Sequence, residues 1–171
     1  MTAVNIHASC VLLESAGARF DAPPDAAILL LGESGAGKSD IVLQLLSRGA
    51  RLVADDRVEL FVRENLLWAR APANLAGLLE VRGVGIVSLP FAADARVSLV
   101  VRLVPPEQAP RLPERQKFDV PPALAFPPHL HPPLILLSAS DISAADRIVL
   151  AAAAFANALF RDQCNSPEGL P

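Results

Sequence analysis

Short hydrophobic runs alternate with polar, turn-forming segments in the first third of the chain. Runs at residues 11–13 and 28–31 are typical of strands, and a segment rich in Gly, Pro and Asp separates them. Between residues 39 and 48, hydrophobic residues recur at helical spacing, and Gly49 follows as a C-terminal stop. A run at residues 51–54 then ends in two acidic residues. This order predicts a strand, a loop, a helix and a second parallel strand, joined by a right-handed crossover.

The hydrophobic pattern continues in the second half of the chain. Runs at residues 58–62, 66–69 and 86–89 predict further strands, and the longest run, at 97–104, predicts a central strand. A shorter run at 134–137 predicts one more strand.

Proline changes the pattern between residues 105 and 133. Ten of the 16 prolines lie there, which excludes a regular helix or an inner strand and predicts a long surface loop. Ser143 and Asp146 have the spacing of a capping box. They predict the start of an alanine-rich helix over about 143–161, before a tail at 162–171.

Composition and charge narrow the class of protein. With 171 residues, 52% hydrophobic and 19% charged, the chain is expected to form a single α/β domain over residues 1–171. The net charge of −3 argues against nucleic acid as a partner. No hydrophobic stretch reaches the roughly 18 residues of a membrane span, and the N-terminus lacks a signal-peptide pattern. Cys10 and Cys164 have no metal-ligand spacing, so we interpret them as free thiols of a cytoplasmic protein.

The segment GESGAGKS matches the phosphate-loop pattern G-x-x-x-x-G-K-[S/T] between a predicted strand and a predicted helix. Its glycines allow backbone N–H groups to surround a phosphate, and the N-terminal end of the helix adds positive potential. Lys38 would neutralise the β/γ-phosphate oxygens, and Ser39 would coordinate Mg²⁺. The predicted nucleotide-binding residues are Gly32, Glu33, Ser34, Gly35, Ala36, Gly37, Lys38 and Ser39.

Two acids, Asp55 and Asp56, follow the next predicted strand, 17 and 18 residues after Lys38. Because parallel α/β sheets bind ligands at the carboxyl edge of their strands, both acids should meet the phosphate loop. On opposite sides of a continued strand, they could divide two roles, as a metal ligand and as a base beside the γ-phosphate. The structural alternative is a turn acid followed by a helix or strand cap.

The segment LEVRGVGI, residues 79–86, carries a second group of polar residues. Glu80 could be a further Mg²⁺ ligand, and Arg82 could hold a phosphate oxygen. Gly83 and Gly85 indicate a bend or a close approach of the backbone to another group. A surface hairpin with an ion pair explains the segment equally well.

Together, GESGAGKSDIVLQLLSRGARLVADD and LEVRGVGI resemble the bacterial HPr kinase/phosphorylase family, in order and in spacing. The resemblance covers roughly residues 7–103 well and the rest loosely. It implies an α/β fold with a P-loop kinase core similar to that of phosphoenolpyruvate carboxykinase, in which helices flank a mixed β-sheet. It also implies ATP-dependent phosphorylation of a serine of HPr, the phosphocarrier of the sugar phosphotransferase system, by a hexamer. The chain is most similar to the short proteobacterial form, which consists of the catalytic domain.

The same resemblance implies roles for individual residues. Asp56 would be the catalytic acid/base, Lys38 the phosphate-loop lysine, and Ser39 and Glu80 the Mg²⁺ ligands. His7 would be the active-site histidine. Arg111 would be the downstream catalytic arginine, with Arg115 as a rival. The alternatives for His7 and Arg111 are an ordinary strand histidine and an exposed loop cation.

Several residues depart from the family pattern or lie outside it. The region expected to carry an Arg/Gly-rich segment, tied to the reverse reaction, reads LSASDISAADR with Arg147 as its only cation, which argues against phosphorylase activity. Ala8 follows the histidine where glycine is usual. We interpret His129 and His131, which lie among prolines without ligand spacing, as loop residues and not metal ligands.

Two other hypotheses remain beside an HPr kinase. One is a P-loop kinase with a different acceptor, a small molecule or another protein. The other is a regulatory module that binds ATP without turnover. The acids Asp55, Asp56 and Glu80 argue against the second, because binding alone needs no base.

Overall fold

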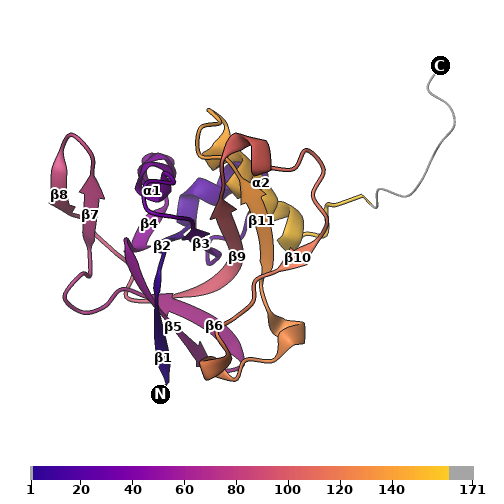
Figure 1. Ribbon diagram of the computed structural model, residues 1–171, viewed down its shortest axis with the longest axis horizontal. Coiled ribbons are helices and arrows are strands. Elements are labelled where there is room, and N and C mark those ends of the chain that lie inside the picture. The colour runs from indigo at the N-terminus through magenta and orange to yellow at the C-terminus, as the bar shows by residue number, and fades with distance from the viewer. Residues whose placement is uncertain (1, 162–171) are drawn as a thin grey trace, which may run out of the picture.

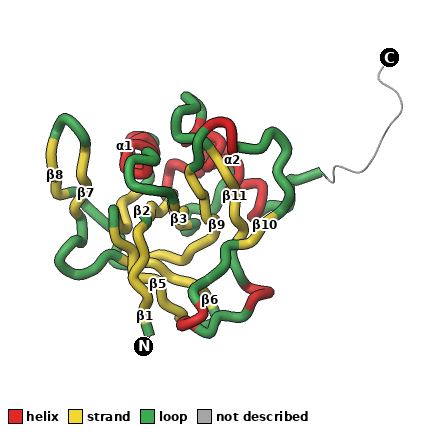
Figure 2. The backbone as a smooth tube through the Cα atoms, in the orientation of Figure 1, coloured by secondary structure: helices red, strands yellow, loops and turns green. Residues whose placement is uncertain are grey.

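The computed structural model describes residues 2–161 (Figure 1). Within that range, a mixed sheet of nine strands forms the centre of the molecule, and a separate hairpin forms a second sheet. Figure 2 shows that strands dominate and that helices are few. The strands of the large sheet are β1 (Ala3–His7), β2 (Ser9–Leu12), β3 (Ala27–Leu31), β4 (Arg51–Ala54), β5 (Arg57–Arg63), β6 (Leu66–Arg70), β9 (Ala95–Leu103), β10 (Gln116–Lys117) and β11 (Pro133–Leu137). The other elements are the hairpin strands β7 (Leu78–Val81) and β8 (Gly85–Ser88), the helices α1 (Lys38–Ser47) and α2 (Ala144–Ala156), and the 3-10 turns η1 (Glu14–Phe20), η2 (Pro106–Gln108), η3 (Pro122–Leu124) and η4 (Pro128–Leu130).

The sheet is organised around β9, the strand expected to be central. The main path of strands runs β1-β5-β6-β9-β3-β2-β4, and β11 pairs with β9 beside it. β9 is parallel to β3 and β11 and antiparallel to β6. β3 and β4 run in the same direction, as predicted, because both are antiparallel to β2, which lies between them. The predicted mixed α/β architecture with flanking helices is therefore confirmed.

Two hydrophobic clusters cover the two faces of the sheet. Alternation along β3 shows the division, because successive side chains of a strand point to opposite faces. Ile28 and Leu30 belong to the cluster that packs against α1 and α2, whereas Ala27 and Leu29 belong to the other cluster. All four are fully buried. Replacing Leu30 by alanine would cost about 2–5 kcal/mol of stability.

The proline-rich segment is only partly the surface loop expected from the sequence. It contains η2, η3, η4 and the short strand β10. Side chains between its prolines are buried in the second cluster, namely Phe118, Val120, Leu124 and Phe126. Prolines prevent long regular elements, but they leave the apolar side chains between them free to pack. The segment is thus a cover for one face of the sheet.

Both ends of helix α2 differ from expectation. Ser143 is the N-cap, but its side chain makes no capping hydrogen bond, so the predicted capping box is wrong. Asp146 instead pairs with Arg48, whose Nε lies 3.0 Å from Asp146 Oδ1. The helix ends at Ala156 and not near residue 161, because the next turn closes with Ala158 in the left-handed region and Leu159 N–H bonded to Ala154 O. The tail expected at 162–171 lies outside the described residues.

The β7–β8 hairpin stands apart from the large sheet, beside α1 (Figure 1). The sequence pattern predicted β8 but not its partner β7, and it did not predict β1. Cross-strand pairing places Leu79 opposite Val87 and Glu80 opposite Ile86. In the described part of the chain, no helix has the length and apolar character needed to cross a membrane.

Candidate active site

The phosphate loop connects β3 to α1. Gly35 and Gly37 have φ values of 82° and 95°, in the left-handed region that glycine adopts without strain. Gly37 is also the N-cap of α1, so the positive N-terminal end of the helix lies at the loop. No side chain caps this end of the helix. A Cβ on Gly37 would lie 2.7 Å from Ala139 Cβ. The loop between β11 and α2 therefore packs directly on the phosphate loop.

Lys38 is held in position by the loop that carries it. Its side chain is nearly buried, and Nζ donates hydrogen bonds to Gly32 O at 2.8 Å and Glu33 O at 3.0 Å. Burial lowers the pKa of Lys38, and the negative charges of Asp56 and Asp55 partly oppose that effect. The ammonium group is thus already positioned at the phosphate loop before a ligand binds.

His7 joins Lys38 to Asp56. Its Nε2 lies 3.0 Å from Lys38 Nζ, and because an ammonium can only donate, Nε2 is the acceptor. The proton of the neutral ring is therefore on Nδ1, which lies 3.0 Å from Asp56 O and 3.2 Å from Asp56 Oδ1. The end of β1 and the start of β5 meet here, since His7 is paired with Arg57 across the sheet.

The two acids lie at different depths of one pocket, which differs from the arrangement expected on a continued strand. β4 ends at Ala54, and Asp56 has φ 64°, so the chain bends between the acids. Asp55 is only 6% exposed, whereas the Asp56 side chain is 65% exposed. The two acids can still take the separate roles of metal ligand and base, because one is buried and the other exposed. Alternation along a strand, the reason expected from the sequence, does not apply.

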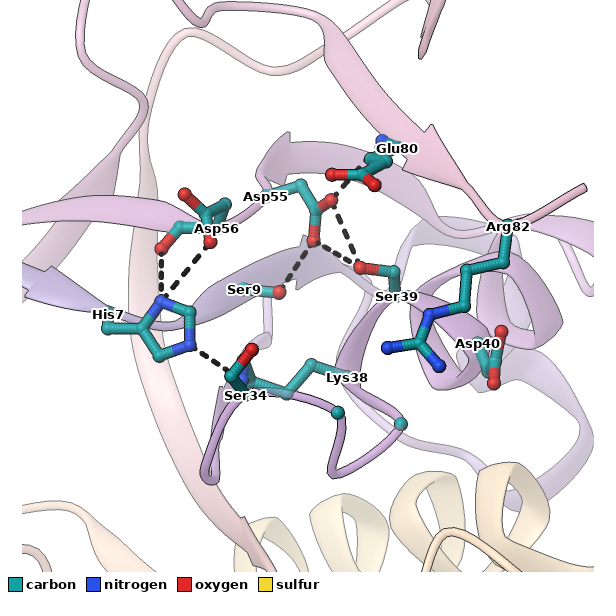
Figure 3. Close-up of a pocket in the computed structure, with 12 residues that line it drawn as sticks. His7, Ser9, Ser34, Lys38, Ser39, Asp40, Asp55, Asp56, Glu80 and Arg82 are labelled. Carbon is teal, nitrogen blue, oxygen red and sulfur yellow. Dashed lines mark hydrogen bonds and ion pairs between the residues drawn. The ribbon is translucent and has the colours of Figure 1, made fainter. Parts of the chain in front are cut away.

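Asp55 accepts hydrogen bonds from three elements (Figure 3). Ser9 Oγ donates to Oδ1 at 2.7 Å, and Ser39 Oγ lies 3.1 Å from both carboxylate oxygens. The Glu80 backbone N–H donates to Oδ2 at 3.4 Å. The carboxylate therefore ties the start of β2, the start of α1 and the β7–β8 hairpin together.

The hairpin carries Glu80 and Arg82 to the same pocket. Arg82 reaches over the phosphate loop, and its Nη2 lies 3.7 Å from the position of a Cβ built on Gly35 (Figure 3). Gly83 and Gly85 have φ values of 79° and 118°, and no atom lies within 4 Å of a Cβ built on either. Their positive φ values suit the bend that the sequence indicated, and the open space shows that no atom of the described chain approaches them closely.

The pocket has a volume of about 180 Å³, below the roughly 300–1,000 Å³ of cavities that enclose a drug-sized ligand. Its size suits a phosphate chain, and a neighbouring cavity of about 890 Å³ shares His7, Ser34 and Gly35 with it. The smaller pocket is lined by His7, Ser9, Ser34, Gly35, Gly37, Lys38, Ser39, Asp40, Asp55, Asp56, Glu80 and Arg82.

Sequence reasoning missed Ser9 and Asp40 among the lining residues. Ser9 had a recognisable signal, because it follows His7 by two positions and so continues the polar phase of an extended segment. Asp40 lies in the first turn of α1. An acidic residue is common there because it interacts favourably with the helix dipole, so its presence gave no sign of a site.

The arginines and histidines of the proline-rich segment do not line this pocket. Arg111 is exposed, and its catalytic role stays a prediction. The Arg115 guanidinium lies 5.5 Å from the centre of the Phe160 ring. His131 stacks on Phe126 with ring centres 5.8 Å apart, and its Nε2 lies 3.2 Å from Phe126 O. His131 therefore has a packing role in the segment.

The donor set at Asp55 suits magnesium shared with a nucleotide. Ser39, Asp55 and Glu80 offer the hard oxygen donors that Mg²⁺ prefers, which in nucleotide sites are one or two carboxylates together with phosphates. Among residues 2–161, no three or more His, Cys, Asp or Glu side chains are grouped as a metal site by themselves. The oxygen donors of Ser39, Asp55 and Glu80 fit a metal whose remaining ligands are phosphate oxygens.

Comparison with known proteins identifies the family. The family model described as the HPr Serine kinase C-terminal domain matches residues 24–118, more than half of the chain. The chain belongs to this family. The matched range includes the phosphate loop, both acids and the β7–β8 hairpin, so the resemblance seen in the sequence is confirmed.

Two HPr kinase/phosphorylases illustrate the relationship. The protein of Clostridium acetobutylicum is 51% identical over 83 residues, which are 44% of this chain and 27% of that protein. The protein of Lactiplantibacillus plantarum is 42% identical over 108 residues, 54% of this chain and 34% of that protein. The chain thus matches only about a quarter to a third of the length of these relatives.

A solved structure shows the same fold. The Hpr(Ser) kinase/phosphatase from Coxiella burnetii superposes with a TM-score of 0.71 at 22% identity, covering 92% of this chain and 99% of that one. The structural likeness covers a larger share of the chain than the family match to residues 24–118 does. The two proteins therefore share their overall fold.

Proposed function

We propose that this HPr serine kinase domain transfers the γ-phosphate of Mg²⁺-ATP to a serine of HPr. The observation that carries the proposal is the exposed Asp56 carboxylate, bonded to His7 at the mouth of a pocket whose floor is a phosphate loop. A phosphate donor site and a candidate base thus share one pocket. The 65% exposure of the Asp56 side chain favours a serine presented by a protein over an enclosed small molecule.

Asp56 is the acid/base in this proposal. As a carboxylate, it accepts the proton of the serine hydroxyl while the serine oxygen bonds to the γ-phosphorus and the bond to ADP breaks. His7 Nδ1–H lies beside Oδ1 and orients the carboxylate, Arg57 Nε lies 3.9 Å from Oδ2, and the exposed face of the carboxylate would meet the acceptor. In the reverse direction, protonated Asp56 would return the proton to the departing serine oxygen.

Charge on the transferred group is balanced from the loop and the hairpin. Lys38 and the N-terminal end of α1 lie on one side, and Arg82 reaches over the loop from the other. Bound Mg²⁺ would neutralise phosphate charge, with Ser39, Asp55 and Glu80 as its protein ligands. The small pocket would take the phosphates, so the nucleoside would lie outside it.

The wider setting follows from the family resemblance and is part of the proposal. HPr would be the protein substrate, the enzyme would act in the cytoplasm, and it would assemble as a hexamer. Arg111 would contribute a cation to the reaction from the proline-rich segment. We propose the kinase direction as the main activity, because the segment 137–147 has Arg147 as its only cation.

The test is phosphorylation of purified HPr. The chain is incubated with Mg²⁺-ATP and HPr, and phosphoserine is located by mass spectrometry. Asp56→Asn should abolish the product but keep nucleotide binding. Asp25→Asn is the matched control, because Asp25 is 69% exposed and ion-paired with Arg96, away from the pocket. Absence of phosphoserine with the unsubstituted chain, or full activity in Asp56→Asn, would refute the proposal.

A further inference from the structure

A fully buried serine lies beside the carboxylate that the metal needs. Within residues 2–161, four polar or charged residues are buried, and three of them, Ser9, Lys38 and Asp55, line the same pocket. Ser9 has 0% exposure, and its hydroxyl donates to Asp55 Oδ1. Burying a hydroxyl is unfavourable unless it is hydrogen-bonded, so this contact accounts for the presence of a serine on an otherwise apolar strand.

The donors on Asp55 are unequal. The Ser9 bond is 2.7 Å long, within the range of a strong hydroxyl–carboxylate bond. Ser39 Oγ is equally distant from both oxygens, at 3.1 Å, so its single proton is divided between two longer contacts. The Glu80 N–H, at 3.4 Å, is longer still. Ser9 is therefore the firmest of the three attachments.

The position of Ser9 in the sheet explains how it reaches the acid. It starts β2, which lies between β3, leading to the phosphate loop, and β4, leading to the acids. His7 and Ser9 are two residues apart in extended backbone, and they contact Asp56 and Asp55 respectively. Ala8 N–H donates to Asp56 O at 3.3 Å and adds a backbone tie between the two segments. One short stretch therefore holds both carboxylates.

We propose that Ser9 is a positioning residue that anchors Asp55 for Mg²⁺-nucleotide binding. With Oδ1 anchored by Ser9, Asp55 keeps its orientation when the Ser39 hydroxyl turns a lone pair toward the metal. Without Ser9, orientation of the carboxylate depends on the Ser39 proton. This inference rests on the proposed use of a magnesium nucleotide at the site. It does not depend on which acceptor receives the phosphate.

The experiment measures how much metal strengthens nucleotide binding. The affinity of the full chain for ADP is measured by calorimetry with and without Mg²⁺, and the ratio of the two affinities is compared between variants. In Ser9→Ala, the ratio should fall about tenfold, as is typical when a residue that supports a metal ligand is removed. The metal-free ADP affinity should stay within about twofold. Ser9→Thr retains the hydroxyl and should restore the ratio.

Ser98→Ala is the matched control, because the Ser98 hydroxyl is bonded to Arg96 O on β9, away from the pocket. An unchanged ratio in Ser9→Ala would overturn the inference. So would an equal loss of ADP affinity with and without metal, or the absence of any metal effect in the unsubstituted chain. The measurement needs no acceptor protein, so it can be interpreted even if the chain does not phosphorylate HPr. Failure of one proposal can therefore be distinguished from failure of the other.

Discussion

His7 Nδ1 lies 3.2 Å from Asp56 Oδ1, although the two residues are 49 positions apart in the chain. The other ring nitrogen lies 3.0 Å from Lys38 Nζ. One imidazole thus connects the group that would hold the phosphate donor to the group that would activate the acceptor. The Lys38 contact sets the tautomer of His7, which places the ring proton on the side of Asp56 and leads to the first prediction.

Replacement of His7 should separate its two contacts. The amide nitrogen of asparagine can take the place of Nδ1, whereas that of glutamine reaches toward the place of Nε2. We therefore expect His7→Asn to retain more phosphotransfer than His7→Gln, with the rate constant of His7→Gln lowered by roughly 10–100-fold, at the lower end of general acid–base effects. Single-turnover kinetics at saturating Mg²⁺-ATP would measure it. Equal rates in both variants would show that the Asp56 contact is not the important one.

Arg82 should contribute to nucleotide affinity. Its guanidinium reaches over the phosphate loop from the hairpin, where a charge-assisted hydrogen bond to phosphate contributes about 1.5–3 kcal/mol. Arg82→Ala should weaken ATP binding by roughly tenfold or more in a fluorescent-nucleotide titration, and Arg82→Lys should recover part of it. Arg96→Ala, which removes an exposed arginine paired with Asp25, is the control. Unaltered binding in Arg82→Ala would place the arginine outside the phosphate site.

Gly37 should tolerate no side chain, for two separable reasons. Its φ of 95° is strained for other residues, and an added Cβ would lie 2.7 Å from Ala139 Cβ. Gly37→Ala should lower the free energy of unfolding by about 1–3 kcal/mol in urea titrations. Adding Ala139→Gly should restore the part due to the clash. Gly83→Ala is the control for strain alone, because its φ is 79° with no atom within 4 Å of the new Cβ. Identical losses in Gly37→Ala and Gly83→Ala would rule out the clash.

Burial of Cys10 predicts a dependence of stability on pH. Burial raises the pKa of the Cys10 thiol, so above the ordinary thiol pKa the unfolded chain loses a proton that the folded chain keeps. The free energy of unfolding should therefore fall as pH rises, by up to about 1.4 kcal/mol per pH unit. The lowered pKa of Lys38 acts in the opposite direction.

Cys10 and Cys164 are the two cysteines of the chain. The effect of the Cys10 thiol is therefore isolated by comparing the Cys164→Ser variant with the Cys10→Ala/Cys164→Ser double variant. Lys38 contributes equally to both and cancels. Urea unfolding between pH 7 and pH 10 should show their stabilities converging as pH rises. A constant difference across that range would mean that the folded state does not retain the Cys10 proton.

Local patterns were enough for the phosphate loop and for most of the strands. The spacing of Gly32, Gly37, Lys38 and Ser39 is typical of a phosphate loop when a strand precedes it and a helix follows it. The structure has both elements, β3 and α1, in these places. The longest hydrophobic run proved to be the central strand, β9. Such patterns are readable because burial of one or both faces sets the periodicity of a strand or helix.

Other features depend on residues far apart in the chain. Asp146 was expected to help cap its own helix, but it pairs instead with Arg48, the C-cap of α1. Phe118 and Phe126 were expected in a surface loop, but the second face of the sheet needs an apolar cover, and they supply it. In both cases a tertiary partner outweighs the local preference.

The sequence by itself determined the phosphate loop, the acids, most of the strands and the family. Only the tertiary structure decided that β2 lies between β3 and β4, and this placement puts His7 and Ser9 against Asp56 and Asp55. The reason is physical. Hydrophobic periodicity reports which face of a strand is buried, but it carries no information on which strands become neighbours, and it is the order of neighbours that assembles this site.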